Sequence, residues 1–228
     1  RGSVNAMEKF TCDEATLSTS FRFGQEVADV ANLILGVNGA VNLTLKGWDQ
    51  LKSSIQTYLM GNQENELHAR MYRTNATLIA DGVELIKKGL VVAMEIDVQD
   101  FTRLLESALA LSECRVKDVK HENLVAFDTW EALVEEARLV GGELARIVNL
   151  INRNEAYKVL AVLGDYTKPL HPDVILTTAH KSKGREFDVV VLADDFPSCY
   201  NQDGQWIGLD EMERNLLYVA ATRARKVL

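Results

Sequence analysis

The chain has 228 residues, of which 47% are hydrophobic and 25% are charged. This length supports one hydrophobic core with a small appended unit, and the composition excludes a chain that is disordered throughout. The formal net charge of -8 at pH 7 excludes a uniformly basic surface that coats nucleic acid, although it permits a narrow basic groove. Composition alone therefore leaves the binding partner open.

The cysteines and the apolar runs limit the cellular setting. Cys12, Cys114 and Cys199 are far apart and include no CxxC pair, which predicts free thiols in a reducing compartment. The four histidines also lack the spacing of metal ligands, so we expect no metal site. No run of 18 apolar residues and no charged segment before an apolar stretch occurs. We therefore expect an intracellular protein without a membrane span or a signal peptide.

The first predicted unit is a strand, a turn and a helix over residues 15–36. Residues 15–21 alternate in the manner of a strand. The apolar residues that follow have the i, i+3, i+4, i+7 spacing of one helix face: Val27, Val30, Ala31 and Ile34. Gly36 is a natural end for this helix.

The same order of elements returns later in the chain. Residues 68–73 predict a strand, and Thr74 or Asn75 can cap the helix that Gly89 ends. The apolar stripe of that helix contains Leu78, Ile79, Val83 and Ile86. The runs 174–178 and 189–192 are short and apolar, as are strands that a parallel sheet buries on both faces. Strands that alternate with helices predict an α/β layered domain.

Residues 97–164 change in character and predict three or four helices. Phe101, Leu104, Leu105 and Ala108 recur at helical spacing, and Asp128 or Thr129 can cap a second helix. A third stripe contains Leu144, Ile147, Val148 and Ile151. We interpret this segment as a structural insertion with acidic, solvated faces and without chemistry of its own.

The strongest local signal is the charged loop at residues 177–188, which contains Gly184 and follows a predicted buried strand. Ligands of open α/β sheets bind at the carboxyl ends of strands, so this loop has the position of a binding site. A solvated surface loop would have a similar composition. The loop alone does not decide between these two interpretations.

A helix is predicted over residues 209–225, with one apolar face formed by Met212, Leu216, Val219 and Ala220. Arg223 falls in the middle of that face if the helix continues. A buried guanidinium is costly unless an anion pairs with it, and that anion is a protein carboxylate or a phosphate. The alternative is that Arg223 lies on a frayed last turn and donates to helix carbonyls.

Arg22 lies where the first helix begins, at the positive end of the helix dipole. A phosphate there would be held by helix amides and by the guanidinium, whereas the alternative is a surface arginine that points away. Two arginines and a charged loop on one α/β domain are the groups that phosphoryl transfer requires. No GxxxxGK[ST] segment occurs, and the only acidic pair that could hold magnesium, Asp194–Asp195, is expected at the surface. The domain would therefore complete a nucleotide site rather than contain one.

Four segments together resemble helicase motifs IV, IVa, V and VI of the UvrD/Rep family of superfamily 1, in order and in spacing. They are residues 20–23, 72–75, 178–188 and 213–224. The Phe-Arg-Phe-Gly form of the first motif and the Leu-Leu-Tyr-Val-Ala-Ala-Thr-Arg-Ala ending of the last motif are most similar to the F-box DNA helicase branch. Residues 1–6 also resemble the end of motif III. The resemblance covers 15–36, 68–89 and 174–228.

This resemblance implies a RecA-like parallel-sheet domain of the P-loop NTPase superfamily, without its own P-loop. Residues 1–95 and 166–228 would form the two parts of the second motor domain, 2A. Residues 96–165 would form a helical insertion that is a reduced form of the family's 2B subdomain. We expect the chain to begin inside a larger protein, after the Walker segments, and to stop where the family has one more strand.

The family's residue roles follow only from the resemblance. Arg22 and Arg223 would reach the γ-phosphate of ATP, which the missing N-terminal motor domain binds together with Mg²⁺, and Glu186 would contact the ribose. Single-stranded DNA or DNA junctions would be contacted by Arg73, Asn75, His180 and Arg1. Arg185 stands where the family usually has leucine, and we expect little consequence.

These roles imply an ATP-dependent helicase that moves 3′ to 5′ along DNA, with an isolated chain that does not hydrolyse ATP. The alternative is a non-catalytic module that binds single-stranded DNA or a protein.

Overall fold

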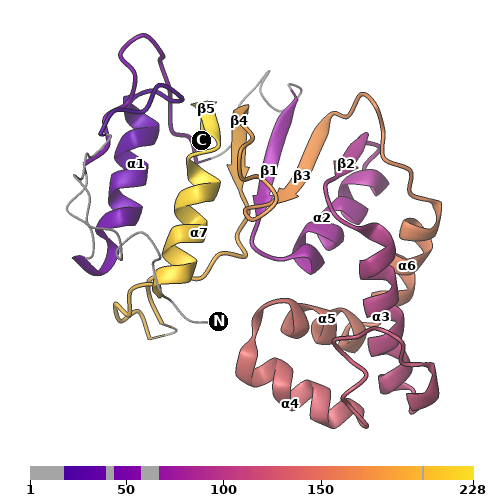
Figure 1. The fold of residues 1–228 in the computed structure, drawn as a ribbon. Helices are drawn as coiled ribbons and strands as arrows, with labels where there is room; N and C mark the ends of the chain where they lie inside the picture. The colour runs from indigo at the N-terminus through magenta and orange to yellow at the C-terminus, as the bar shows by residue number, and fades with distance from the viewer. Residues whose placement is uncertain (1–17, 40–43, 58–66, 202) are drawn as a thin grey trace, which may run out of the picture.

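A computed structural model describes residues 18–39, 44–57, 67–201 and 203–228. Its five named strands form one parallel sheet in the order β2-β3-β1-β4-β5 (Figure 1). The strands are β1 His68–Tyr72, β2 Val92–Met94, β3 Val174–Thr178, β4 Phe187–Leu192 and β5 Ala224–Val227. The α/β prediction is confirmed, and the fold is RecA-like.

Helices cover both faces of the sheet. Helices α1, Gln25–Gly36, and α7, Glu211–Ala221, pack against one face, where Ala69 and Met71 of β1 are fully buried. Helix α2, Asn75–Lys87, packs against the other face with Tyr72. Successive residues of β1 thus point toward opposite faces that are both covered, which explains why all of its residues except Arg70 are buried.

Helices α3 to α6 extend from the α2 side of the sheet (Figure 1). They share one continuous core with α2, β2 and β3, through side chains such as Phe101, Leu133, Ile147 and Leu163. The bounds of these four helices are α3 Val98–Ser112, α4 Trp130–Val140, α5 Gly142–Asn152 and α6 Ala156–Asp165. Short 3-10 helices also span Val37–Gly39, after α1, and Val116–Asp118, after α3. The helical character predicted for this segment is therefore confirmed.

Several helix ends follow the predicted signals. Thr74 caps α2 by accepting from the Thr77 N–H, and Thr129 caps α4 in the same way through the Ala132 N–H. Helix α1 ends at Gly36, as predicted. Gly89, two residues after α2, has a φ of +88°, a backbone conformation that glycine adopts without steric cost.

The prediction of one helix over 209–225 is wrong at its end. Helix α7 stops at Ala221, and residues 224–227 form β5 beside β4. The β4 edge decides this, because the Phe187 N–H donates to the Arg223 carbonyl at 3.0 Å. Met212, predicted on the buried face, is 80% exposed.

Two further differences concern strands. The sequence analysis did not predict β2, whose three residues are too few to show a periodicity. In the described part of the strand predicted over 15–21, the only pairing is a single bridge between Thr19 and Lys46.

Among the described residues, no helix has the length and apolar content needed to cross a membrane.

Candidate nucleotide and nucleic-acid sites

Arg22 is held in position by a close approach of two backbone segments. A Cβ atom on Gly24 would lie 2.3 Å from the Leu51 carbonyl oxygen, and one on Gly47 would lie 2.3 Å from the Gly24 carbonyl carbon. The Trp48 N–H also donates to the Phe23 carbonyl at 2.9 Å. Only glycine permits this contact, which fixes the backbone directly after Arg22, where α1 begins.

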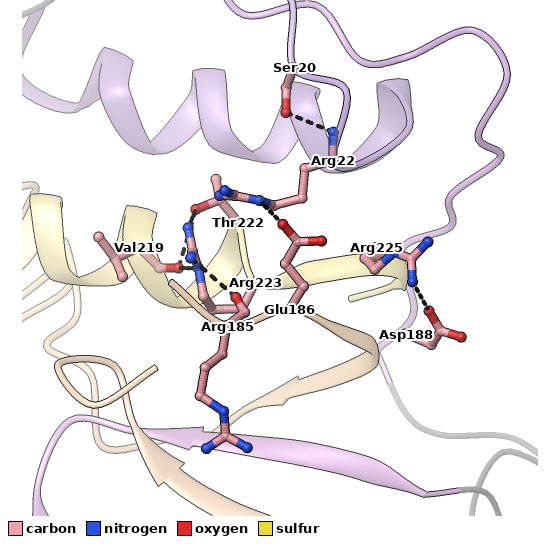
Figure 2. Close-up of polar contacts among 9 residues, drawn as sticks. All are labelled: Ser20, Arg22, Arg185, Glu186, Asp188, Val219, Thr222, Arg223 and Arg225. Atoms are coloured by element: carbon pink, nitrogen blue, oxygen red, sulfur yellow. Dashed lines mark hydrogen bonds and ion pairs between the residues drawn. The ribbon is translucent and has the colours of Figure 1, made fainter. Parts of the chain in front are cut away.

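Arg223 is buried, with 7% of its surface exposed, and its guanidinium contacts neutral oxygens (Figure 2). Its Nε donates to the Val219 carbonyl at 2.9 Å, and its terminal nitrogens donate to the Arg185 carbonyl and the Thr222 hydroxyl at 3.2 Å each. Donation to a helix carbonyl is the arrangement that the sequence analysis gave as the alternative. The residue is nevertheless buried rather than frayed.

Arg22 lies beside Arg223 and forms an ion pair with Glu186, with 2.6 Å between Nε and Oε1 (Figure 2). Burial, and next the positive charge of Arg22, lower the pKa of the Arg223 guanidinium, while Glu186 acts in the opposite direction. We name Arg22, Glu186 and Arg223 the amino-end cluster. It combines two cations with one carboxylate, an excess of positive charge that favours an anion.

The position of this cluster corrects one expectation. The loop 177–188 does begin at the carboxyl end of β3, but Glu186 directly precedes β4 and Arg223 directly precedes β5. Because these strands are parallel, both residues lie at the amino ends of their strands. The loop thus runs from one end of the sheet toward the other, and Glu186 does not lie at the carboxyl end.

Arg185 anchors this loop. Its guanidinium lies 3.1 Å from Glu95 and 4.9 Å from the centre of the Phe187 ring, and its carbonyl accepts from Arg223. Arg185 thus has its own partners in the fold.

A second group of charged residues lies at the carboxyl ends of the strands. Arg73 follows β1, and its Nε lies 2.9 and 2.8 Å from the two carboxylate oxygens of Glu213 on α7. Asp195, which follows β4, accepts from the N–H groups of Arg73 and Thr74 at 2.9 Å each and from the Thr74 hydroxyl at 3.0 Å. Asp195 is 7% exposed, so its expected surface position is wrong. The three donors offset the cost of burying its carboxylate.

The helical insertion contributes a carboxylate to the same group. Glu143, in the first turn of α5, accepts from the Asn75 N–H at 2.9 Å, and burial raises its pKa. Its other oxygen, Oε1, is buried without a hydrogen-bond partner. We name Arg73, Glu143, Asp195 and Glu213 the carboxyl-end cluster. The sequence analysis missed the contribution of Glu143, whose only local signal is its position directly after Gly141 and Gly142, in the first turn of α5.

The residues expected to contact DNA fall at this end of the sheet. Asn75 is the first residue of α2, and exposed His180 follows Ala179, whose N–H donates to the Tyr72 carbonyl at 2.9 Å. Arg1 lies outside the described residues. The six residues of β4 separate the two clusters by about 20 Å along the strand direction. In the described part of the chain, no group of three or more His, Cys, Asp or Glu side chains is arranged to hold a metal ion.

The parallel sheet with helices on both faces defines the class of this chain as a RecA-like α/β domain. The family model of the UvrD-like helicase C-terminal domain matches residues 93–228. The chain belongs to this family.

Two curated relatives extend the similarity over nearly the whole chain. F-box DNA helicase 1 of Gallus gallus is 29% identical over 265 residues, which cover 100% of this chain and 25% of the relative. F-box DNA helicase protein 1 of Schizosaccharomyces pombe is 31% identical over 237 residues, which cover 93% of this chain and 26% of the relative. The chain thus spans about a quarter of the length of both relatives.

Proposed function

We propose that this chain acts as the second motor domain of an ATP-dependent DNA helicase. In this proposal, Arg22 and Arg223 contact the γ-phosphate of ATP, and Glu186 contacts the ribose. A preceding motor domain of the same protein binds the nucleotide with Mg²⁺. Arg73, Asn75 and His180 contact single-stranded DNA at the other end of the sheet. Family membership and the names of both relatives, which are DNA helicases, support this assignment.

The observation that carries the proposal is that Arg223 is buried beside a second arginine and contacts neutral oxygens. A buried guanidinium loses hydration, and a neighbouring cation increases the cost. A phosphate group offers several charged oxygens, so its binding would offset both the lost hydration and the repulsion between the two cations. Glu186 engages Arg22 through Nε, which is one side of the guanidinium fork. The amino-end cluster therefore fits a multiply charged anion better than it fits the protein's own groups.

The expected chemistry is electrostatic. As charge develops on the transferred phosphoryl group, the two guanidiniums would stabilise it without a covalent step of their own. Arg223 is pre-organised for this role, since Val219, Thr222 and Arg185 fix its plane before any ligand binds. Pre-organised donors are most effective where water is excluded, and burial provides that condition.

The test is Arg223→Ala in the full-length protein. We expect DNA-stimulated ATP turnover to fall by about 10³-fold or more, as for other arginine fingers, with nearly unchanged binding of single-stranded DNA. Arg225→Ala is a matched control, because Arg225 lies two residues away and its contact with Asp188 is half-exposed (Figure 2). Normal turnover by Arg223→Ala would rule out the proposed role and favour a non-catalytic binding module.

The chain by itself provides a second test. We expect no ATP turnover above background when it is mixed with DNA and Mg²⁺, because no phosphate-binding loop occurs in its sequence. Measured turnover that follows the chain through purification would mean that the nucleotide site lies within it.

A further inference from the structure

The ion pair between Arg73 and Glu213 connects the carboxyl-end cluster to α7, the helix that leads to Arg223. Both oxygens of Glu213 lie within hydrogen-bond distance of the Arg73 guanidinium, and the two side chains are 29% and 16% exposed. Glu213 is the third residue of α7, and Arg223 follows the last residue by two positions. The two ends of one helix therefore reach the two clusters.

Arg223 is joined to the last turn of α7 by two hydrogen bonds, and its carbonyl accepts from the Phe187 N–H of β4. Its N–H donates to the Ala220 carbonyl at 3.2 Å, and its Nε donates to the Val219 carbonyl at 2.9 Å. A helix of 11 residues is a stiff element about 16 Å long. A displacement of the Glu213 end would thus be transmitted to the Arg223 guanidinium rather than absorbed between them.

Arg73 has a fixed backbone and a side chain that can change its partner. Asp195 binds the N–H groups of Arg73 and Thr74, which ties this turn to the end of β4. The guanidinium extends from this anchored turn to Glu213, and the hydrogen bond with Glu213 is the largest influence that raises the pKa of Arg73. An incoming phosphate would compete with Glu213 for the same donors.

We propose that Glu213 is a positioning residue that couples DNA binding to ATP hydrolysis. When a DNA phosphate takes the Arg73 guanidinium, Glu213 loses its cation, and the restraint on the first turn of α7 is released. The helix then moves Arg223 relative to the nucleotide. This inference rests on the proposed function, since it requires DNA at Arg73 and ATP at Arg223.

The test is Glu213→Gln in the full-length protein, which keeps the size of the side chain and removes its charge. We measure ATP turnover with and without saturating oligothymidylate, and the Kd of a fluorescent oligothymidylate at one fixed salt concentration. The ratio of the two turnover rates is expected to fall about fivefold or more, the lower limit of typical coupling between two sites. The Kd is expected to stay equal or to decrease, because Arg73 no longer has a competing carboxylate.

The matched control is Glu211→Gln, an exposed residue two positions earlier on the same helix. It makes the same chemical change without touching the ion pair, so the turnover ratio should stay at the wild-type value. A purely structural role of the ion pair would lower both turnover rates of Glu213→Gln and its Tm together. An unchanged ratio in that variant would overturn the inference.

A charge exchange keeps the inference testable if Glu213→Gln is poorly folded. Arg73→Glu combined with Glu213→Arg restores an ion pair, so the Tm is expected to recover, but a DNA phosphate would then meet a carboxylate at position 73. DNA stimulation should therefore stay lost, and its recovery would show that the ion pair has a structural role only. If Arg223→Ala abolishes turnover while Glu213→Gln keeps the ratio, this inference fails and the proposed function stands. If Arg223→Ala turns over normally, the proposed function fails first.

Discussion

In the amino-end cluster two arginines lie near the carboxylate of Glu186, whereas in the carboxyl-end cluster one arginine lies among the carboxylates of Glu143, Asp195 and Glu213. Arg73 experiences the charges of Glu213, Asp195 and Asp210. Arg223 is buried, and it is repelled by the charge of Arg22 and attracted by the charge of Glu186. The same residue type is thus short of negative charge at one end of the sheet and fully neutralised at the other.

This difference shows how the two clusters can respond to a ligand. A phosphate that binds the amino-end cluster adds a missing charge, so little must be displaced. A phosphate that binds Arg73 must displace Glu213, so its binding carries a cost and changes the protein. The first arrangement suits tight recognition of a nucleotide, and the second suits a contact that forms and breaks in each cycle.

Removal of the Arg22 charge from the amino-end cluster is expected to have a large effect on ATP turnover. Arg22→Ala removes one of the two cations and leaves Glu186 beside Arg223. We expect ATP turnover of the full-length protein to fall by about 10² to 10³-fold, the usual cost of one lost donor to a developing charge. The Arg22 side chain is 37% exposed, so the change should alter the free energy of unfolding by less than about 1 kcal/mol. Turnover within twofold of wild type would show that the second cation of the amino-end cluster is not needed for hydrolysis.

An intermediate effect is expected at Asp195, which supports the carboxyl-end cluster. Asp195→Ala leaves the N–H groups of Arg73 and Thr74 and the Thr74 hydroxyl without their acceptor. The free energy of unfolding should fall by about 2 to 4 kcal/mol, since unpaired buried donors are costly. Urea denaturation measures this loss, and Asp194→Ala, at the exposed neighbouring position, should stay within about 0.5 kcal/mol of wild type. Equal losses in both variants would contradict the assigned role of Asp195.

The smallest effect concerns the pH dependence of stability at Glu143, which faces Arg73 and Asp195. Burial raises the pKa of its carboxyl above the ordinary value of 4.5, so the folded chain holds the proton more tightly than the unfolded chain. Its contribution to stability therefore falls as the pH rises from about 4.5 through the folded pKa.

Glutamine at this position accepts from Asn75 without ionising. We expect the Tm of Glu143→Gln, relative to wild type, to rise by about 2 to 4 °C across this pH window in thermal scans. A difference in Tm that is flat with pH would show that the carboxyl titrates equally in both states.

Local signals in the sequence predicted the elements that depend on a few neighbouring residues. Thr74 caps α2 because its hydroxyl needs only the N–H three residues later, and Gly36 ends α1 at the predicted residue. The strand β3 was predicted because its run of apolar residues is buried on both faces. By contrast, β5 could not be predicted, because Ala224 joins the sheet only where the edge of β4 is free to receive it.

The site residues show the same difference between what local sequence predicts and what long-range contacts decide. Arg22 and Arg223 were predicted as a pair, and the structure brings them together, but the ion pair with Glu186 joins residues 164 positions apart in the chain. The sequence marked Asp195 only as half of an acidic pair expected at the surface, and it did not mark Glu143, because each becomes important through a backbone N–H of residues 73–75. An acidic side chain in the sequence does not reveal which amide it will meet.

The α/β class, most helices and strands, and the family resemblance could be inferred without coordinates, since periodicity, caps and motifs are local properties of the chain. The balance of charge could not be inferred in this way: the amino-end cluster has one carboxylate for two arginines, and the carboxyl-end cluster has several for one arginine. Charge balance depends on distances of a few ångströms between distant segments, and on the burial that removes water from around them. Both are set when the sheet and its helices pack together.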